Sequence, residues 1–449
     1  MLIVSVPVIC ASELSTGQLG NFGHGSRFYI AGSQPRQCWR TYQSGSDISE
    51  LAFERLWSEI ADIGRHPVTG GYRRFAWNQA DLHMREWFAG ECTSRGLELS
   101  EDRMGNQWGW WGDPDGSAAG GIVTGSHLDS VPDGGAFDGP LGVVSALLAI
   151  DKLRSNGFRP TRPIGVVNFV DEEGARFGVS CVGSRVITGA LSAEKALGLR
   201  DADGVTMAEA MRTAGRHPGS LGPDPEALAR IGSFVELHIE QGRGLIDLGH
   251  PVAVGNGLWA HGRWRIEIPG EPNHAGTTRL SDRRDAVIGC AQLVLEARTA
   301  AEAHDSLATI GKINIMPGGV NAIAGLATAW LDARASDEAA LSATVAQIAG
   351  QAVSLGAVVA EESRTPHTDF DDVLVTRLTR VLDGAPVMST GAGHDAGILT
   401  NAGVPAAMIF VRNPTGVSHS PAEWAEPEDC LAGVAALASV LAELAGAEP

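Results

Sequence analysis

Short apolar runs alternate with longer amphipathic runs along most of the chain, and this alternation constrains the fold more than any other feature. The apolar runs have the length and composition of buried strands, and they span residues 121–124, 163–170, 234–239 and 406–411. The amphipathic runs have helical periodicity, and they span residues 48–63, 80–95, 141–153 and 428–444. Strands that alternate with helices predict an α/β domain with a mostly parallel central sheet flanked by helices.

Residues 259–366 interrupt this pattern. His261–Ile268 alternates polar and apolar residues with a period of two, which is typical of a half-exposed antiparallel strand. Two further strands (309–315 and 327–335) and two helices (283–303 and 337–354) follow in the order β-α-β-β-α. We therefore predict a ferredoxin-like α+β domain over 259–366, inserted into a larger domain made of residues 47–258 and 367–449.

The first 46 residues differ from the rest of the chain, and the overall composition excludes several classes of protein. Residues 1–46 are rich in Gly, Ser and Gln without periodicity, and we expect a poorly ordered extension or a start that is not native. The chain has 34 Lys and Arg against 53 Asp and Glu, so it has no general attraction for nucleic acid or anionic lipid. No apolar run reaches the ~18 residues that a membrane span needs. Six scattered cysteines without a C-x-x-C pair fit a reducing, cytoplasmic setting.

Four clusters of polar residues lie in or directly after the predicted strands of the larger domain, at 124–140, 170–178, 236–242 and 416–424. Ligands bind at the carboxyl ends of the strands in open parallel sheets, so we expect these clusters to converge. Their His and carboxylate side chains suit Zn²⁺, Mn²⁺ or Co²⁺, and one carboxylate can bridge two such ions. Of the adjacent Glu172 and Glu173, one could bind metal while the other acts as general base.

Each cluster also has a simpler interpretation when it is taken alone. His238 could be a core histidine, Asp138 could be a turn residue beside two glycines, and the Glu172-Glu173 pair could begin a solvated helix. The Gly-rich segment 133–142 lacks G-K-[ST], so it is not a phosphate-binding P-loop. The coincidence of all four clusters at strand ends favours the two-metal interpretation.

Four motifs from these clusters and two motifs from elsewhere in the chain form a recognisable set. They read GSHLDSVPDGGAFDGPLG, DEEGARFG, ELHIEQG, NHAGTT, GAGHDA and GVSHSPAE, in this order. With them, residues 48–445 resemble the M20-type metallo-amidohydrolases. The resemblance is strongest to the branch of allantoate amidohydrolases, N-carbamoyl-L-amino acid hydrolases and β-ureidopropionases.

The resemblance implies two divalent ions per chain, either Zn²⁺ or Mn²⁺, with Co²⁺ or Ni²⁺ as further candidates. His127, Asp138 and His238 match the ligands of one ion. Asp138, Glu173 and His419 match those of the other, with Asp138 as the bridge. Residues 47–258 and 367–449 would then form the catalytic, dimetal domain.

The same resemblance assigns three further roles. Glu172 matches the general base, and Asp129 matches the carboxylate that fixes the orientation of His127. The inserted domain would act as a lid and as the interface of a homodimer. In it, His274 matches the residue that stabilises the oxyanion, often from the partner subunit.

Gln241, Asn321 and Arg334 match substrate-binding positions, and Arg334 suits a bidentate grip on a carboxylate. Two stretches near these positions depart from the family pattern. Residues 321–325 read NAIAG where N-V-I-P-G is usual, and Arg279-Leu280 replaces the usual Pro-Met. Both weaken any assignment of one particular substrate.

The predicted function is that of an amidohydrolase with two metal ions, which cleaves a C–N bond of a ureido acid. The substrate would be allantoate or an N-carbamoyl-L-amino acid, and the products ammonia and CO₂ or their equivalents. Two alternatives stay open. One is an N-formyl or N-acyl amino acid hydrolase or a peptidase on the same scaffold, and the other is a non-catalytic binding protein with a relict site.

Overall fold

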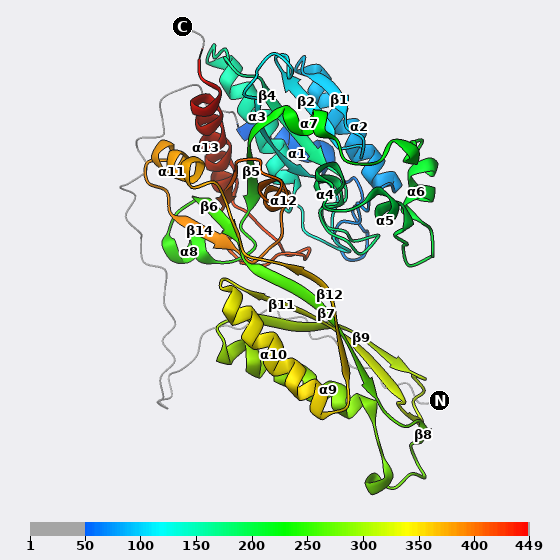
Figure 1. The fold of residues 1–449 in the computed structure, drawn as a ribbon. Coiled ribbons are helices and arrows are strands. Elements are labelled where there is room, and N and C mark those ends of the chain that lie inside the picture. The colour runs from blue at the N-terminus through cyan, green and yellow to red at the C-terminus, as the bar shows by residue number, and fades with distance from the viewer. Residues whose placement is uncertain (1–49, 448–449) are drawn as a thin grey trace, which may run out of the picture. The chain divides into compact units, whose positions relative to one another are not determined.

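A computed structural model describes residues 50–447 of the 449-residue chain (Figure 1). The predicted extension over residues 1–46 lies outside the described residues. Residues 50–258 and 367–447, here called the α/β region, form a nine-stranded sheet with helices packed against it. Residues 259–366, here called the inserted region, have a separate four-stranded sheet and a separate apolar core.

The strands of the large sheet pair in the order β1-β2-β4-β3-β5-β15-β6-β13, and β14 also pairs with β6. Their bounds are β1 (Glu98–Glu101), β2 (Gln107–Trp111), β3 (Gly121–His127), β4 (Ile164–Phe169), β5 (Ile231–Ile239), β6 (Val252–Leu258), β13 (Thr368–Asp369), β14 (Val387–Thr390) and β15 (Ala406–Val411). The four central strands β4, β3, β5 and β15 are parallel to one another. Antiparallel pairs flank them, β2 with β4 on one side and β6 with β15 on the other. The predicted α/β fold with a mostly parallel central sheet is confirmed.

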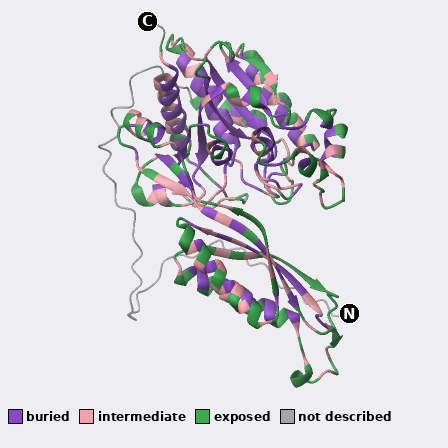
Figure 2. Cartoon of the chain, viewed as in Figure 1, coloured by how far each residue is buried: buried purple, intermediate pink, exposed green. Residues whose placement is uncertain are grey.

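Helices cover the central strands, which are buried along almost their whole length. Every residue of β3, β4 and β15 is buried, as expected for parallel strands with helices on both faces (Figure 2). One group of helices, α3 with α1 and α13, packs against β3 and β5, and a second group, α12 with α4, packs against β5 and β15. The helices of this region are α1 (Glu50–Ile60), α2 (Gln79–Ser94), α3 (Pro140–Ser155), α4 (Val182–Thr188), α5 (Ala193–Gly198), α6 (Met207–Thr213), α7 (Pro225–Ala229), α8 (Gly244–Leu248), α11 (Asp372–Val381), α12 (Asp395–Asn401) and α13 (Pro427–Ala445), with a 3₁₀ turn at Pro218–Ser220.

Beyond the three strands that the sequence predicts, the inserted region contains a fourth strand in its main sheet and a separate pair of two-residue strands. Its elements are β7 (Ala260–Pro269), β8 (Asn273–His274), α9 (Ala286–Ala303), β9 (Leu307–Met316), β10 (Ala322–Ile323), β11 (Leu326–Ala335), α10 (Glu338–Ser354) and β12 (Val358–Thr365), with a 3₁₀ turn at Leu280–Asp282. The antiparallel order β12-β7-β11-β9 completes the β-α-β-β-α-β arrangement of a ferredoxin-like unit. β12 escaped prediction because it is an edge strand with a mostly exposed, charged sequence.

Small residues allow the aromatic strand β2 to pack closely on the sheet. A Cβ atom at Gly121 or at Gly165 would lie 2.8 Å from the ring of Trp110. The absence of both side chains therefore lets this ring lie against the backbone of β3 and β4. Among residues 50–447, no helix combines the length and apolar character that crossing a membrane requires.

Candidate metal centre

The four predicted clusters come together at the carboxyl ends of the parallel strands. His127 is the last residue of β3, and His238 is the second-last residue of β5. Glu172 and Glu173 follow β4, and His419 lies in the loop after β15. Because β4, β3, β5 and β15 are neighbours in the sheet, these side chains reach one place.

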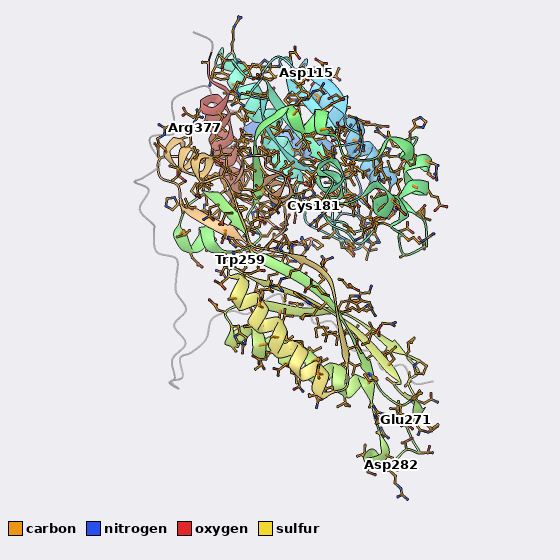
Figure 3. All side chains as sticks on the ribbon, viewed as in Figure 1. Asp115, Cys181, Trp259, Glu271, Asp282 and Arg377 are labelled. Carbon is orange, nitrogen blue, oxygen red and sulfur yellow. The ribbon has the colours of Figure 1, made fainter. Side chains whose placement is uncertain are left out.

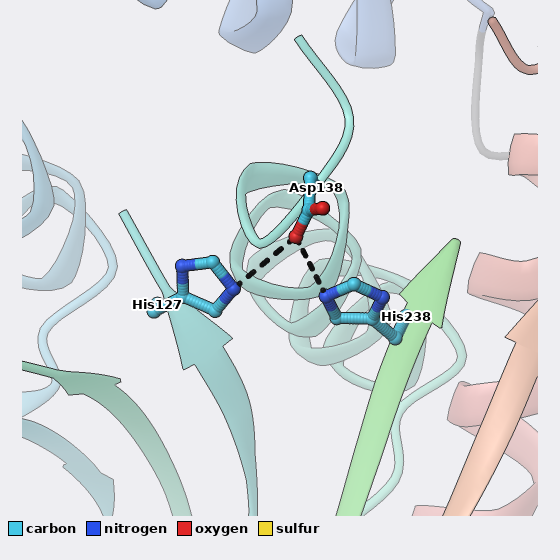
Figure 4. A group of neighbouring side chains, drawn as sticks. All are labelled: His127, Asp138 and His238. Carbon is cyan, nitrogen blue, oxygen red and sulfur yellow. Dashed lines mark ion pairs between the residues drawn. The ribbon is translucent and has the colours of Figure 1, made fainter. Parts of the chain in front are cut away.

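Asp138 lies at the centre of the group and uses its two oxygens on different partners. Oδ1 is 3.5 Å from Nε2 of His127 and 3.2 Å from Nε2 of His238 (Figure 4). Oδ2 is 3.5 Å from Nε2 of His419, whose Nε2 is also 3.6 Å from Oε2 of Glu173. Two sets of potential metal ligands therefore share Asp138, the first with His127 and His238 and the second with Glu173 and His419.

The histidine nitrogens that face Asp138 are suited to binding a cation. Nε2 of His127 and Nε2 of His238 are buried and have no hydrogen-bond partner. The opposite nitrogens are satisfied, since Nδ1 of His127 lies 3.2 Å from the carbonyl oxygen of Asp129 and Nδ1 of His238 lies 2.9 Å from that of Ile239. A hydrogen on each Nδ1 leaves the lone pair of Nε2 free, which is the usual arrangement of a metal-binding histidine. The residues present thus fit a divalent cation.

The charge balance of the site also favours cations. Asp129, Asp138, Glu172, Glu236 and Glu423 are all buried in the neighbourhood of His127, His238 and His419. Buried carboxylates are costly unless they are paired with cations or bind metal. Burial raises the pKa of Glu172 well above its usual range, although His127 opposes this shift. Burial and the charge of Asp138 together raise the pKa of Glu173 well above its usual range.

Asp138 and His127 show the opposite tendency, because they stabilise each other's charged forms. Burial disfavours an ionised Asp138, yet the nearby imidazoles of His127 and His238 outweigh it and hold the pKa of Asp138 well below its usual range. Burial likewise lowers the pKa of His127, but Asp129 and Asp138 raise it well above the usual value. A proton and a metal ion compete for the same imidazole nitrogen, so metal affinity should fall as the pH falls.

Asp129 orients three of the neighbouring groups at once. Its Oδ1 lies 3.4 Å from Nδ1 of His127. Its two carboxylate oxygens also accept the backbone N–H groups of Glu172 and Glu173, each at 3.1 Å. The predicted role of Asp129 toward His127 is consistent with this geometry. Its hydrogen bonds with the backbone of the two glutamates were not predicted.

Glu172 and Glu173 have different surroundings although they are adjacent. Glu173 belongs to the second ligand set, whereas Glu172 belongs to neither. Oε2 of Glu172 is 3.9 Å from Nε2 of His127, and Oε1 accepts a hydrogen bond from the thiol of Cys181 at 3.3 Å. This arrangement leaves Glu172 beside the ligand sets, where a general base would have to lie.

The predicted substrate-binding residues do not all lie near this centre. Gln241 does, because its amide donates to Oδ2 of Asp138 at 2.9 Å and to Oγ of Ser418 at 3.2 Å. Arg334 in β11 reaches the α/β region by donating to the carbonyl oxygen of Gly391 at 2.7 Å. The same guanidinium forms two hydrogen bonds with Asp332, at 2.7 and 3.2 Å.

His274 and Asn321 lie elsewhere in the inserted region. His274 is in β8, which pairs with β10 so that His274 faces Ala322, and the carbonyl oxygen of Asn321 accepts the N–H of Ala275 at 2.9 Å. Both residues are exposed. Among residues 50–447, neither residue forms a hydrogen bond or ion pair with the side chains around Asp138, so a single chain does not bring them together with the candidate metal centre.

Several side chains around the centre were not assigned roles from the sequence. Cys181, labelled in Figure 3, contacts Glu172. Glu423 accepts the backbone N–H groups of Phe137 and Asp138. Glu423 lies in the recognisable GVSHSPAE motif, but only its distance from His419 in the sequence hints at a role. Cys181 has no sequence signal, because its contact depends on how the chain turns back after Gly174.

A third group lies behind His238. Glu236, His238 and His394 present ligand atoms to one another, and the rings of His238 and His394 are 4.5 Å apart. Glu236 accepts hydrogen bonds from the hydroxyl of Ser126 at 2.9 Å and from the N–H of Ala396 at 3.2 Å. Because this group shares His238 with the first ligand set, we treat it as the surroundings of that histidine.

Comparisons with known proteins agree with the geometry. The profile of Peptidase family M20/M25/M40 matches residues 123–443. The N-carbamoyl-L-amino acid amidohydrolase of Geobacillus stearothermophilus is 35% identical, with 88% of this chain and 99% of that protein covered. The allantoate amidohydrolase of Escherichia coli (strain K12) is 32% identical, over 88% of this chain and 98% of that protein.

A solved structure gives the same result for the fold. An amidase of the hydantoinase/carbamoylase family from Burkholderia vietnamiensis superposes with a TM-score of 0.79 at 30% identity, covering 90% of this chain and 98% of that one. The resemblance inferred from the sequence motifs is thereby confirmed. The chain belongs to Peptidase family M20/M25/M40.

Proposed function

We propose that this protein is a hydrolase that uses two divalent metal ions to cleave a C–N bond of a ureido acid, either allantoate or an N-carbamoyl-L-amino acid. The observation that carries the proposal is that the two carboxylate oxygens of Asp138 face different histidines. Oδ1 faces His127 and His238, while Oδ2 faces His419. A carboxylate placed between two ligand sets is suited to bridge two cations. The names of the similar amidohydrolases support the choice of ureido acids.

The residues of the chain divide the chemistry among them. His127, Asp138 and His238 would hold one ion, and Asp138, Glu173 and His419 the other. When bound, such ions polarise a substrate carbonyl and lower the pKa of water toward neutrality. We favour Zn²⁺ or Mn²⁺, since histidine and carboxylate ligands suit both.

Glu172 acts as the general base in this proposal. Its carboxylate takes a proton from the attacking water and later delivers it to the leaving nitrogen. Burial keeps the pKa of Glu172 high, which makes the carboxylate a stronger base than an exposed glutamate. Asp129 holds the backbone N–H of Glu172 and so fixes where the base lies. With a carbamoyl group, the products are ammonia, CO₂ and the free amino acid.

Substrate recognition is assigned to residues of both regions. Gln241 lies against Asp138, close enough to contact a bound substrate beside the metal ions. Arg334 would bind the substrate carboxylate with its guanidinium, which Asp332 already holds in a fixed orientation. The proposed small-molecule partner is thus an anionic ureido or N-acyl amino acid.

The geometry of the inserted sheet favours a homodimer with shared active sites. Arg334 pairs with His261 near one end of β11, whereas Leu326 begins the other end, beyond which His274 and Asn321 lie. Eight residues of strand separate positions 326 and 334, which is about 27 Å at ~3.4 Å per residue. One substrate cannot touch Arg334 and His274 of the same chain across that span. We propose that His274 and Asn321 complete the site of a partner subunit.

The edge of the inserted sheet offers a surface for such a dimer. β9 is an edge strand whose Ile313, Ile315 and Met316 are exposed by 39–50%. Unpaired edges with apolar side chains are suited to pairing with another chain. For the location in the cell, we propose the cytoplasm, which fits the cysteine usage.

The test is a turnover assay with matched metal analysis. The purified protein is stripped with a chelator, reloaded with Zn²⁺ or Mn²⁺, and offered allantoate, N-carbamoyl amino acids, N-formyl amino acids and dipeptides. We expect up to two ions per chain, turnover of a ureido acid, and loss of both metal and turnover in Asp138→Ala. Preferred turnover of formyl compounds or dipeptides would favour the alternative hydrolases, and full activity after exhaustive chelation would contradict the proposal.

A further inference from the structure

We propose that Glu423 is a positioning residue that joins the loop of Asp138 to the loop of His419 and thereby controls metal affinity at the second ligand set. This inference rests on the two-metal function proposed above. It concerns the set of Asp138, Glu173 and His419, and it predicts little effect on the set of His127, Asp138 and His238.

The carboxylate of Glu423 holds the backbone that presents Asp138. Its Oε1 accepts the N–H of Phe137 at 2.8 Å and the N–H of Asp138 at 2.9 Å. Glu423 is 4% exposed, so water does not compete for these bonds. Two hydrogen bonds from adjacent N–H groups to one oxygen fix both the position and the direction of this short segment.

The other oxygen of Glu423 is linked to the metal-facing side of Asp138. The hydroxyl of Ser418 lies 3.3 Å from Oε2 of Glu423 and 3.2 Å from Oδ2 of Asp138. Oδ2 is the same oxygen that faces His419. Glu423 and His419 lie in the same loop, and Ser418 directly precedes His419, so Glu423 links this loop to the backbone of Asp138.

The loop of Asp138 has a space shaped for this carboxylate. A Cβ atom at Gly135 would lie 2.3 Å from Oε1 and 2.4 Å from Cδ of Glu423. Any larger residue at position 135 would therefore displace the carboxylate. Gly135 has no positive φ, so this close approach, rather than backbone conformation, is what its lack of a side chain allows.

The second ligand set depends on such support more than the first. His127 and His238 lie in central strands, where His127 pairs with Phe169 of β4 and His238 pairs with Phe410 of β15. His419 lies in a loop, has a left-handed φ of 55°, and has a side chain that is 50% exposed. Loss of Glu423 should therefore release His419 and loosen the surroundings of Oδ2 of Asp138, while the strand histidines keep Oδ1 between them.

The experiment measures metal binding directly. Wild-type protein, Glu423→Gln, Gly135→Ala and the control Glu428→Gln are stripped and titrated with Mn²⁺ or Zn²⁺ by calorimetry, and bound metal is counted after dialysis. Glu428 is an exposed residue of α13 in the same stretch of chain. We expect two binding events in the wild type. The weaker one should lose 10- to 100-fold in affinity in Glu423→Gln and Gly135→Ala, as is typical when a residue that orients metal ligands is removed.

Two further measurements distinguish a positioning role of Glu423 from a general loss of stability. Excess metal should restore most of kcat in Glu423→Gln with little change in KM, and the tighter binding event should stay within about twofold. Gly135→Ala removes no polar group, so the same pattern there assigns the effect to the position of the carboxylate. If Glu423→Gln does not fold, Gly135→Ala alone decides the matter.

The outcomes distinguish this inference from the function on which it rests. A wild type that binds fewer than two ions overturns the two-metal site and this inference with it. A wild type that binds two ions, with variants that bind both as tightly, overturns the role of Glu423 alone. A lower melting temperature with unchanged metal affinities would also overturn it, because Glu423 would then be merely structural.

Discussion

Glu172 and Glu173 share one turn of chain and one anchor, the carboxylate of Asp129, yet they face different neighbours. Glu173 faces His419 and Asp138, whereas Glu172 lies between His127 and the thiol of Cys181. Two identical side chains can therefore have different functions because of their surroundings alone, as paired catalytic carboxylates commonly do.

Replacing these glutamates one at a time should separate the functions. Glu172→Gln keeps size and hydrogen bonding but cannot accept a proton, so kcat should fall by ~10²–10⁴-fold with the metal content unchanged. Glu173→Gln is the matched control and should lose metal from one position. Kinetics combined with metal counting checks both, and metal loss in Glu172→Gln would require the two functions to be exchanged.

Cys181 should matter for rate through its contact with the base. Its thiol and its backbone N–H both contact Glu172, the latter at the carbonyl oxygen, and Cys181 holds a left-handed φ of 53°. Cys181→Ala should lower kcat roughly 10-fold or more with KM and metal content unchanged, since small displacements of a catalytic group are costly. Cys181→Ser should recover part of the rate because a hydroxyl also donates.

Cys430 provides the comparison, because it is equally buried but lies in α13 within the apolar core. Cys430→Ala should lower the melting temperature without a specific effect on kcat. If both alanine variants lose stability alone and keep the same kcat, Cys181 is a packing residue.

Helix α3 lies beside the candidate metal centre, since it begins two residues after Asp138. Gly139 precedes it with a φ of +84°, and a Cβ atom there would lie 2.5 Å from the ring of His127. Gly157 follows the same helix with a φ of +73° and no heavy atom within 4 Å of its Cβ position. The two glycines thus share a positive φ but differ in their surroundings.

This pair predicts different outcomes for the same substitution. Gly157→Ala should cost about 1–2 kcal/mol of the free energy of unfolding, the cost of a left-handed alanine. Gly139→Ala carries at least this cost and also displaces His127, so metal binding should weaken as well. Thermal unfolding with and without metal measures both effects, and equal metal affinity in the two variants would show that the ring of His127 moves aside freely.

The elements that the sequence predicts well are those with a strong apolar pattern. Strands β3, β4 and β15 are buried throughout, and their sequences are nearly all apolar or small. Strands β1 and β12 were not predicted, because they lie at sheet edges and consist largely of exposed polar residues. β6 contains two glycines and an asparagine, so pairing with its neighbours rather than its own composition makes it a strand.

The residues of the candidate site likewise divide into those with a recognisable local sequence pattern and those without one. The histidines and carboxylates at strand ends could be predicted because strand order and residue type indicate both position and chemistry. Glu423 contacts Phe137 and Asp138 over a sequence separation of 285–286 residues, and no local pattern reveals such a contact. His274 and Asn321 were assigned from their motifs, and their distance from Arg334 along the inserted sheet becomes evident only from the strand pairing.

At the scale of the whole molecule, the division of the site between two chains can be tested by mixing subunits. His274→Ala and Glu172→Gln should each be nearly inactive as pure proteins. If His274 serves the partner's site, a mixed dimer has one site with both residues intact. Random exchange makes half of the dimers mixed, so about a quarter of the wild-type activity should return.

If each site is instead formed by a single chain, the experiment gives the opposite result, because every site in a mixed dimer then contains one substituted residue. The activity of the mixture would stay at the sum of the two pure proteins. A control mixture of Glu172→Gln with Asp138→Ala should recover nothing in either case, since both residues lie in the same α/β region.

The chain leaves and rejoins the large sheet at one place, where Leu258 of β6 pairs with Thr368 of β13. The two paired segments continue into the inserted region, where His261 of β7 pairs with Thr365 of β12. A segment whose ends are already neighbours adds little loop-closure entropy to the rest of the chain. In evolutionary terms, residues 259–366 could have been gained, lost or exchanged as a cassette without altering the register of any strand that carries a metal ligand. A protein engineer could likewise join 258 to 368 by a short turn and keep the sheet that carries His127 and His238, while removing the whole surface proposed to contact a partner.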